Sequence, residues 1–260
     1  MTGFARIDDC VLHYTFREGR GPAVVFLNSL GTDLRIWDGV VDALPTDLCL
    51  LRMDKRGHGL SETAPGDMAR FAADAAGLMD RFGLSRALIC GVSIGGMIAQ
   101  ELALSRPDLV GGLLLSNTAA KIGDAAGWQD RLFRIETDGL PAMADGVLDR
   151  WFPRAFKDGH PDMVAGYRTM LSRTDAEGYS NACRALAGAD LRDRVGTIAC
   201  PTVVIGGSED GSTPPDVVRG LADAIPGADY IEIGGAGHLP CIQTPGDVAA
   251  PLMDLHRRIS

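Results

Sequence analysis

The sequence predicts an α/β fold with a mostly parallel sheet, helices on both faces and a helical insertion. Short apolar runs alternate with segments of helical periodicity along most of the 260 residues, which is the rhythm of parallel strands joined by right-handed helical crossovers. Strand signals are missing between about Thr118 and Arg194, where Gly and Pro interrupt segments that carry aromatic residues. A hydrophobic content of 46% supplies a sizeable core.

The first elements are a hairpin and two buried strands. Residues 4–7 and 11–16 alternate as strands across a short polar turn. The continuous apolar run at 23–27 is typical of a strand buried on both faces, and 49–53 is a second short strand. Between them, apolar residues recur at helical spacing across 36–44.

The middle of the core follows the same alternation. A helix is expected from about Met68 to Phe82, with Asp67 as its N-cap. A buried strand at 86–90 precedes an apolar helix at 97–104, and a further strand covers 110–115. Two consecutive strand–helix units of this kind favour parallel pairing.

The last third contains the insertion and the end of the sheet. No strand is expected in 118–194, which we interpret as helical. The alternation resumes with a strand at 202–205, a helix at 214–225 and a strand at 229–233, and a final helix follows Gly246. In all, eight segments are predicted as strands.

The pattern G-x-S-x-G at Gly91–Gly95 places Ser93 between a predicted strand and a predicted helix. This is the context of a nucleophile elbow, a turn so sharp that the serine adopts strained backbone angles and its hydroxyl leaves the packed layer. The plain alternative is a Gly/Ser turn without chemistry, and the flanking strand and helix favour the catalytic interpretation. The sequence therefore predicts a nucleophilic serine.

A serine nucleophile needs a general base, and the base needs an orienting acid. In an open parallel sheet such groups gather beyond the carboxyl ends of the strands. Asp210 and His238 each follow one of the last two strands, giving the chain order Ser, Asp, His. A turn aspartate and a structural loop histidine are the alternatives, and Glu209 competes with Asp210. The remaining histidines fit the role of base less well: His13, His58, His160 and His256.

Two backbone N–H groups are candidates for an oxyanion hole. Ile94 begins the helix after Ser93, where a backbone N–H has no intrahelical partner. The second donor is expected in the loop after the third strand, and we assign it to Leu30 in Asn28–Thr32.

Composition and missing motifs exclude several classes of function. A formal net charge of −9 argues against nucleic acid or an anionic membrane as partner. No apolar run is long enough to span a bilayer, and residues 1–10 lack a signal-peptide pattern, so a cytoplasmic protein is expected. The six cysteines form no C-x-x-C pair and are expected as free thiols. The chain has no H-E-x-x-H motif and no Cys/His cluster, so a metal site is not expected. It has no G-x-G-x-x-G in a first βα unit, so a dinucleotide site is not expected either.

These residues resemble the α/β-hydrolase superfamily over nearly the whole chain, and more narrowly the 3-oxoadipate enol-lactonases. Where many α/β-hydrolases have His-Gly, this chain has Asn28-Ser29, a form similar to that of the enol-lactonases. Four stretches carry the closer match: Asn28–Asp33 with Trp37-Asp38, Asp54–Ser61, Leu115–Ala120 and Arg150–Pro153.

The resemblance implies an α/β-hydrolase fold with an eight-stranded core at 1–117 and 195–260 and a helical cap at 118–194. It implies hydrolysis of 3-oxoadipate enol-lactone to 3-oxoadipate, a late step of the β-ketoadipate pathway of aromatic degradation, without a cofactor. Ser93 would attack the lactone carbonyl, His238 would transfer protons, and Asp210 would orient the imidazole.

The small anionic substrate of these relatives implies a cation or several donors in the pocket. The alternative is that arginines on the cap are solvated and that its aromatic residues only pack. Lys121 is a further cation early in the insertion. The substrate-binding candidates are Asn28, Ser29, Trp128, Arg131, Arg134 and Trp151.

Two other functions stay open at the level of sequence. One keeps the fold and changes the substrate, as in an esterase, a perhydrolase or a carbon–carbon bond hydrolase. Faster turnover of aryl acetates than of the enol-lactone would favour it. The other is a catalytically silent small-molecule sensor, which would bind a ligand without turnover that depends on Ser93.

Overall fold

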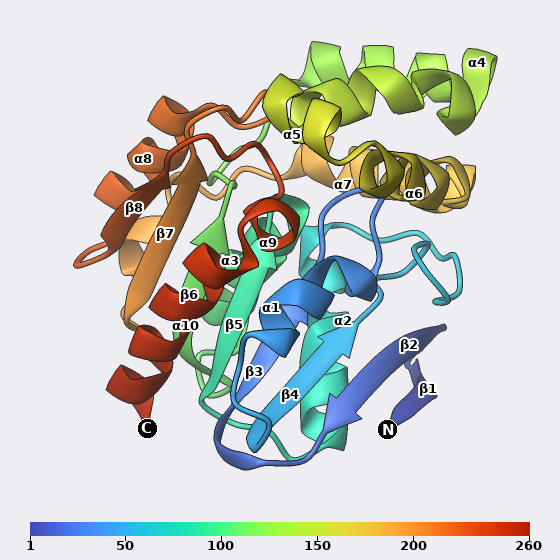
Figure 1. Ribbon diagram of the computed structural model, residues 1–260. Coiled ribbons are helices and arrows are strands. Elements are labelled where there is room, and N and C mark those ends of the chain that lie inside the picture. Colours follow the sequence, from blue (N-terminus) through green and yellow to red (C-terminus); the bar gives the residue numbers. More distant parts are fainter.

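A central eight-stranded sheet organises the molecule, as the computed structural model of residues 1–260 shows (Figure 1). The strand order is β1-β2-β4-β3-β5-β6-β7-β8. β2 pairs antiparallel with both β1 and β4, and every other neighbouring pair is parallel. The strands are β1 Thr2–Ile7, β2 Cys10–Arg17, β3 Arg20–Leu27, β4 Leu48–Met53, β5 Ala87–Val92, β6 Val110–Ser116, β7 Thr202–Gly207 and β8 Asp229–Ile233.

Helices cover both faces of this sheet. α2 and α3 pack together on one face, whereas α1 and α10 pack together on the other (Figure 1). α8 packs against the two last strands. The core helices are η1 Leu34–Trp37, α1 Asp38–Asp42, α2 Met68–Arg81, α3 Ile94–Ser105, η2 Val195–Thr197, α8 Pro215–Ala224, α9 Pro240–Gln243 and α10 Pro245–Ile259. The predicted α/β fold with a mostly parallel sheet is confirmed.

The central strands are buried because their sequences are apolar on both faces. Every residue of β5 and of β6 is buried, as expected for parallel strands covered by helices on both sides. α2 is amphipathic and begins as predicted, since the Asp67 carboxylate accepts a hydrogen bond from Arg70 N at 2.8 Å.

Some predicted boundaries differ from the observed ones. The segment predicted as one helix across 36–44 is a 3₁₀ turn followed by a five-residue helix, because the Asp33 carboxylate accepts the N–H of Arg35 and tightens the first turn. The last helix is preceded by the short α9, since Pro240 and Pro245 each occupy a first helical position. Arg86 has a φ of 48° and lies before β5 rather than in it.

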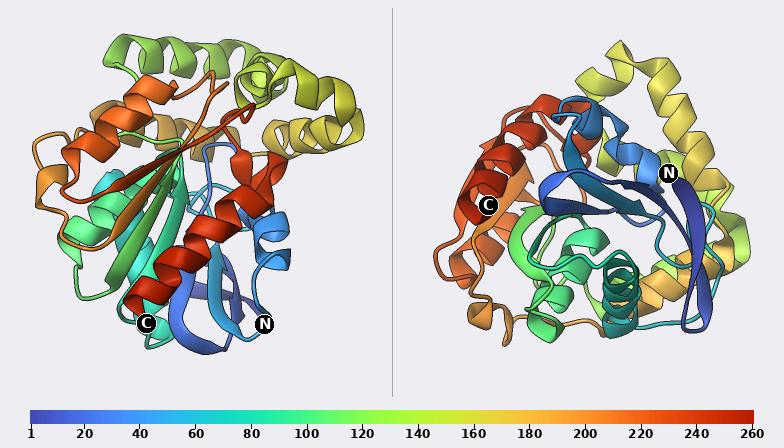
Figure 2. Two further views of the ribbon diagram at one scale, coloured as in Figure 1. Left: turned by 60° about the vertical axis from the view of Figure 1, so that its left-hand side comes forward. Right: turned by 90° about the horizontal axis from the view of Figure 1, so that it is seen from below.

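Four helices and no strand occupy the stretch between β6 and η2. We call these helices the cap: α4 Ala125–Trp151, α5 Arg154–Gly159, α6 Pro161–Ser172 and α7 Ala176–Gly188. They lie over the carboxyl ends of the parallel strands (Figures 1 and 2). The groups that follow these strands therefore face the cap.

α4 is interrupted at Gly139. This residue has φ 75° and ψ 163°, so α4 consists of two helical segments with a sharp change of direction between them. The combination lies in a region that is open almost only to glycine. Pro141 follows as the second residue of the second segment.

The cap touches the core through two glycines. A Cβ added to Gly57 would lie 2.3 Å from Gly178 Cα, and one added to Gly178 would lie 2.3 Å from Gly57 O. The first turn of α7 therefore lies directly on the backbone of the loop after β4.

That loop is held by its own charged residues. Asp54 accepts N–H bonds from Leu34 at 2.8 Å and Leu60 at 3.0 Å, and Arg56 forms a buried ion pair with Asp74 at 2.6 Å.

None of the helices combines the length and the apolar character that a membrane span requires.

Candidate active site

Ser93 lies at the turn between β5 and α3, in a strained backbone conformation. Its φ of 59° and ψ of −123° are unfavourable for a residue with a side chain, at a cost of about 1–3 kcal/mol. The turn is held by Ser93 N, which donates to Ser116 O at 3.0 Å, and by Thr118 Oγ1, which donates to Ser93 O at 2.7 Å.

The residues flanking the turn must be glycines. A Cβ on Gly91 would lie 2.3 Å from Gly95 O, and a Cβ on Gly95 would lie 2.1 Å from Leu27 O. The strand and the helix approach each other closely on both sides of Ser93, as the sequence pattern predicts.

Asp210 and His238 form a buried pair at the ends of β7 and β8. His238 Nδ1 lies 3.0 Å from Asp210 Oδ1 and 2.9 Å from Oδ2. The two residues are 5% and 2% exposed. With Nδ1 engaged by the carboxylate, the other ring nitrogen of His238 is left for proton transfer.

Asp210 has several further donors. Thr213 Oγ1 donates at 2.6 Å, Asn117 Nδ2 at 2.8 Å, and the N–H groups of Ser212 and Thr213 at 2.7 and 3.1 Å. Burial of the carboxyl opposes ionisation, but the attraction of His238 and the hydrogen bonds from His238, Thr213 and Asn117 outweigh it. The pKa of Asp210 therefore lies below its usual range, and the carboxylate stays ionised.

Asn117 connects three strand ends. It is fully buried with a φ of 48°, and its Nδ2 donates to Gly237 O at 3.1 Å as well as to Asp210. Asn117 N donates to Ile205 O at 2.7 Å. The sequence drew attention to Asn117 only as part of a family motif, because its contacts depend on loops that follow distant strands.

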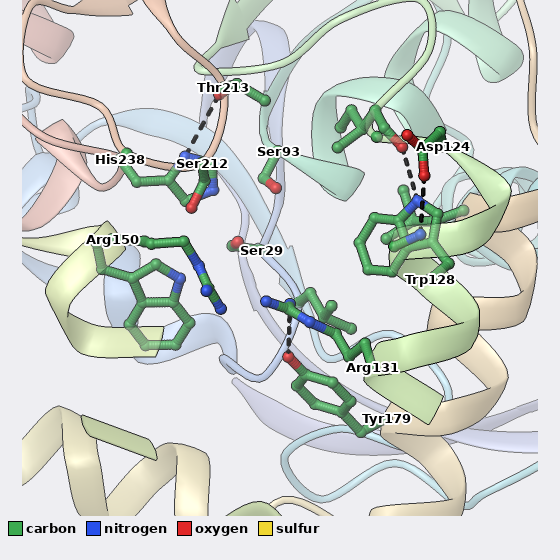
Figure 3. A pocket seen from close by; sticks show the side chains of 17 residues that line it. Ser29, Ser93, Asp124, Trp128, Arg131, Arg150, Tyr179, Ser212, Thr213 and His238 are labelled. Carbon is green, nitrogen blue, oxygen red and sulfur yellow. Dashed lines mark hydrogen bonds between the residues drawn. The ribbon is translucent and has the colours of Figure 1, made fainter. Parts of the chain in front are cut away.

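Ser93 and His238 open onto the same cavity, which has a volume of about 260 Å³ (Figure 3). No hydrogen bond joins the Ser93 hydroxyl to His238. Such contacts often form only when a substrate is bound. Glu209 does not line this cavity.

The two predicted oxyanion donors are the N–H groups of Leu30 and Ile94. Leu30 lines the cavity, and its N–H makes no hydrogen bond within the protein. Ile94 is the first residue of α3, where a helix leaves N–H groups without partners.

Four of the six predicted substrate-binding residues line the cavity: Ser29, Trp128, Arg131 and Trp151. Asn28 and Arg134 do not. Asn28 is buried beside the cavity, with Nδ2 bonded to Thr32 O, and Arg134 lines a neighbouring cavity of about 170 Å³. Lys121 forms an ion pair with Asp190 at 3.1 Å outside the cavity.

The cavity also holds Arg150 and Tyr179, which sequence reasoning missed as site residues. Arg131 Nη1 donates to Tyr179 Oη at 3.2 Å, and its guanidinium lies 5.5 Å from the Trp128 ring centre (Figure 3). The Arg150 guanidinium makes no hydrogen bond within the protein. Neither arginine has a carboxylate within ion-pair distance, and burial together with the charge of Arg131 lowers the pKa of Arg150.

The other histidines have partners away from Ser93. His13 Nδ1 contacts Asp54 at 2.7 Å, and His256 Nε2 contacts Pro22 O at 2.8 Å. His58 is buried with its Nδ1 near Arg56 O. His238 is the one histidine that lines the cavity of Ser93.

The strand order, the serine turn and the buried Asp–His pair define the α/β-hydrolase class. The family model of the alpha/beta hydrolase family matches residues 24–250, and the chain belongs to this family.

The chain is also similar to individual proteins and solved structures of known activity. The chain is 34% identical to 3-oxoadipate enol-lactonase 2 of Acinetobacter baylyi, over 91% of this chain and 90% of the relative. It is 31% identical to a pimeloyl-[acyl-carrier protein] methyl ester esterase of Chromobacterium violaceum, over 91% and 94% of the two chains. The crystal structure of the enol-lactonase from Burkholderia xenovorans is similar with a TM-score of 0.93 and 37% identity, covering 97% of this chain and 99% of that one.

Proposed function

We propose that this hydrolase converts 3-oxoadipate enol-lactone to 3-oxoadipate through an acyl-enzyme on Ser93. One observation carries the proposal. A strained serine and an aspartate-paired histidine open onto a cavity that also holds two arginines without carboxylate partners. This combination suits an ester bond in a small anionic molecule. The likeness to enol-lactonases of two organisms supports the choice of lactone.

In the proposed reaction, Ser93 Oγ attacks the lactone carbonyl while the free ring nitrogen of His238 takes the hydroxyl proton. Asp210 holds the other nitrogen and stabilises the imidazolium. The N–H groups of Leu30 and Ile94 receive the oxyanion. Collapse of the tetrahedral intermediate breaks the ring C–O bond, and His238 returns the proton to the departing enol oxygen.

The second half of the reaction repeats this chemistry with water. His238 removes a proton from water, which attacks the acyl-enzyme carbonyl, and then protonates Ser93 Oγ as the new carboxylic acid leaves. The released enol tautomerises to the ketone. One lactone and one water give one oxo acid, and no cofactor is needed.

Arg131 and Arg150 are proposed to bind the carboxylate of the substrate. A protein with a net charge of −9 repels an anion on average, so binding depends on a local cationic region. Both arginines are half-buried in the cavity wall and have no carboxylate partner, which strengthens their interaction with an anion.

We also propose that two parts of the chain have different roles in the reaction. The core, residues 1–117 and 195–260, carries the reacting groups. The cap region, residues 118–194, carries Trp128, Arg131 and Arg150, which contact the substrate.

The likeness to a methyl ester esterase favours one rival, an acyclic carboxylic ester as substrate. The deciding experiment follows ultraviolet absorbance during hydrolysis of freshly generated 3-oxoadipate enol-lactone and of p-nitrophenyl acetate, with wild type and Ser93→Ala. Faster Ser93-dependent turnover of the lactone supports the proposal. Faster turnover of the aryl ester overturns the choice of substrate, and activity that survives in Ser93→Ala overturns the mechanism.

A further inference from the structure

Lys55 is a buried lysine with an unusual set of partners. It lies in the loop after β4 and is 3% exposed. Buried lysines are normally paired with carboxylates, yet no carboxylate lies within ion-pair distance of this one. The other two lysines of the chain, Lys121 and Lys157, both form ion pairs with aspartates.

The amino group of Lys55 instead contacts two carbonyls of one loop. Nζ donates to Ser29 O at 2.5 Å and lies 3.4 Å from Thr32 O. The charged and titratable groups that act on it from the surrounding elements are Asp54, Asp33 and His58. Burial, opposed by the two aspartates, lowers the pKa of Lys55 to about 7.

Ser29 O receives more than one donor. Thr32 Oγ1 donates to it at 2.9 Å, and Thr32 N lies 3.3 Å away. Three N–H or O–H groups thus converge on one carbonyl, although a carbonyl oxygen has only two lone pairs. This concentration marks the Ser29 carbonyl as the most strongly held acceptor of the loop.

The carbonyl of Ser29 and the N–H of Leu30 belong to the same planar peptide unit. A bond that fixes the carbonyl therefore fixes the direction of the N–H on the opposite side of the unit. A donor on the oxygen also draws electron density from the nitrogen, because hydrogen bonds in a chain polarise one another. Leu30 lines the cavity of Ser93, and its N–H makes no hydrogen bond within the protein.

We propose that Lys55 is a positioning residue for the oxyanion hole, which acts through the Ser29–Leu30 peptide. It holds the Leu30 N–H toward the oxyanion that forms on the substrate and strengthens this N–H as a donor. The inference rests on the proposed function, because it requires acyl transfer to Ser93, but it does not depend on which ester is cleaved.

The test compares Lys55→Met, which keeps the volume and removes the donor, with Lys55→Gln, which keeps a donor without charge. Lys157→Met is the matched control, since it makes the same change at a lysine of the cap surface. Each variant is assayed for kcat and KM with p-nitrophenyl acetate and with the enol-lactone. The affinity for phenylboronic acid, which forms a tetrahedral adduct with an active serine, is measured in parallel.

We expect Lys55→Met to lower kcat on the order of 10–100-fold, less than the loss of a direct oxyanion donor, with KM within about twofold. The affinity for the boronic acid falls by a similar factor. Lys55→Gln recovers part of both losses, and Lys157→Met matches the wild type. A purely structural role would instead change KM or leave the affinity for the tetrahedral adduct unaffected.

The inference is overturned when Lys55→Met folds and keeps its kcat and its boronic acid affinity. Should Lys55→Met fail to fold, Thr32→Val and Thr32→Ser probe the same carbonyl: only the valine variant should lose kcat and adduct affinity, and equal behaviour of both overturns the inference. If the wild type shows no Ser93-dependent activity on either ester, the proposed function itself is overturned. If the wild type is active and Lys55→Met is equally active, only the inference about Lys55 is overturned.

Discussion

Arg131 and Arg150 line the same cavity although they are nineteen positions apart on α4. On a straight helix this separation corresponds to about 28 Å along the axis. The reversal at Gly139 brings the two guanidinium groups to one wall, so a single backbone conformation creates the cationic side of the cavity.

The first prediction concerns this glycine. Gly139→Ala should lower the free energy of unfolding by about 1–3 kcal/mol, because alanine is strained at a φ of 75°. It should also raise KM for the anionic lactone, since the arginines move apart. Gly146→Ala is the control on the same helix, where an added Cβ meets no atom within 4 Å. Urea unfolding and lactone kinetics check both variants, and equal stabilities would contradict the prediction.

The second prediction tests the two arginines. Arg131→Gln and Arg150→Gln should each raise KM for the enol-lactone about 10–100-fold, the range expected for losing a charge-assisted hydrogen bond. KM for neutral p-nitrophenyl acetate should stay within about twofold. Arg154→Gln, at a side chain that is 91% exposed on α5, serves as control. A similar rise for both substrates would show that the cavity had lost its shape rather than its charge.

The third prediction separates activity from stability at Ser93. Ser93→Ala and Ser93→Gly should both retain less than about a thousandth of wild-type turnover. The glycine variant should nevertheless be more stable than the alanine variant by about 1 kcal/mol, because glycine is unstrained at a φ of 59°. Thermal and urea unfolding measure the difference. Equal stability of the two variants would argue that the turn stores no strain.

The fourth prediction concerns Asp210. Asp210→Asn should lower kcat on the order of 10³–10⁴-fold, because the amide no longer orients and stabilises the imidazolium. The ionised carboxylate of the wild type also contributes stability, since the pKa of Asp210 is lower when folded than its ordinary 3.8. This contribution is complete above the unfolded pKa and is lost as the pH falls through the folded pKa.

The difference in unfolding free energy between wild type and Asp210→Asn should therefore shrink as the pH falls through 3.8 and below. Urea titrations at half-unit intervals measure it. Parallel curves for the two proteins would contradict the lowered pKa.

The fifth prediction concerns a pH dependence of the same sign at Lys55, in a higher pH range. The pKa of Lys55 falls from 10.5 to about 7 on folding, so between these values the unfolded chain binds a proton that the folded chain has released. The unfolding free energy of the wild type should then rise relative to Lys55→Met by about 1 kcal/mol per pH unit above pH 7. Unfolding curves at pH 7, 8 and 9 provide the measurement, and a constant difference would mean that Lys55 keeps its ordinary pKa.

Sequence reasoning singled out Ser93, Asp210 and His238 because each lies within a few residues of the carboxyl end of a strand. The carboxyl ends of parallel strands meet at one edge, so chain order and strand assignment suffice to bring these residues together. The structure places Asp210 and His238 in direct contact and both residues near the cavity of Ser93.

The cap residues that line the cavity could be predicted only in part from the sequence. Arg131 and Arg134 lie one helical turn apart and look equivalent in the sequence, yet only Arg131 lines the cavity. Arg150 and Tyr179 reach it through the reversal at Gly139 and the packing of α4 on α7. These are tertiary effects that local periodicity does not encode. The role of Lys55 could not be predicted from the sequence for a related reason, because its partners are backbone carbonyls of a distant loop.

The backbone contact between Gly57 and Gly178 restricts how this protein can diversify. Exchange of a cap between related hydrolases would be a direct way to acquire a new substrate while the reacting groups stay unchanged. On this core, a grafted cap with any side chain at the position of Gly178 would collide with the Gly57 backbone. Chimeric proteins should therefore fold and function only when the grafted cap comes from a hydrolase with glycine at this position. The close contact between Gly57 and Gly178 thus limits which substrate specificities this core can acquire by exchange of its cap.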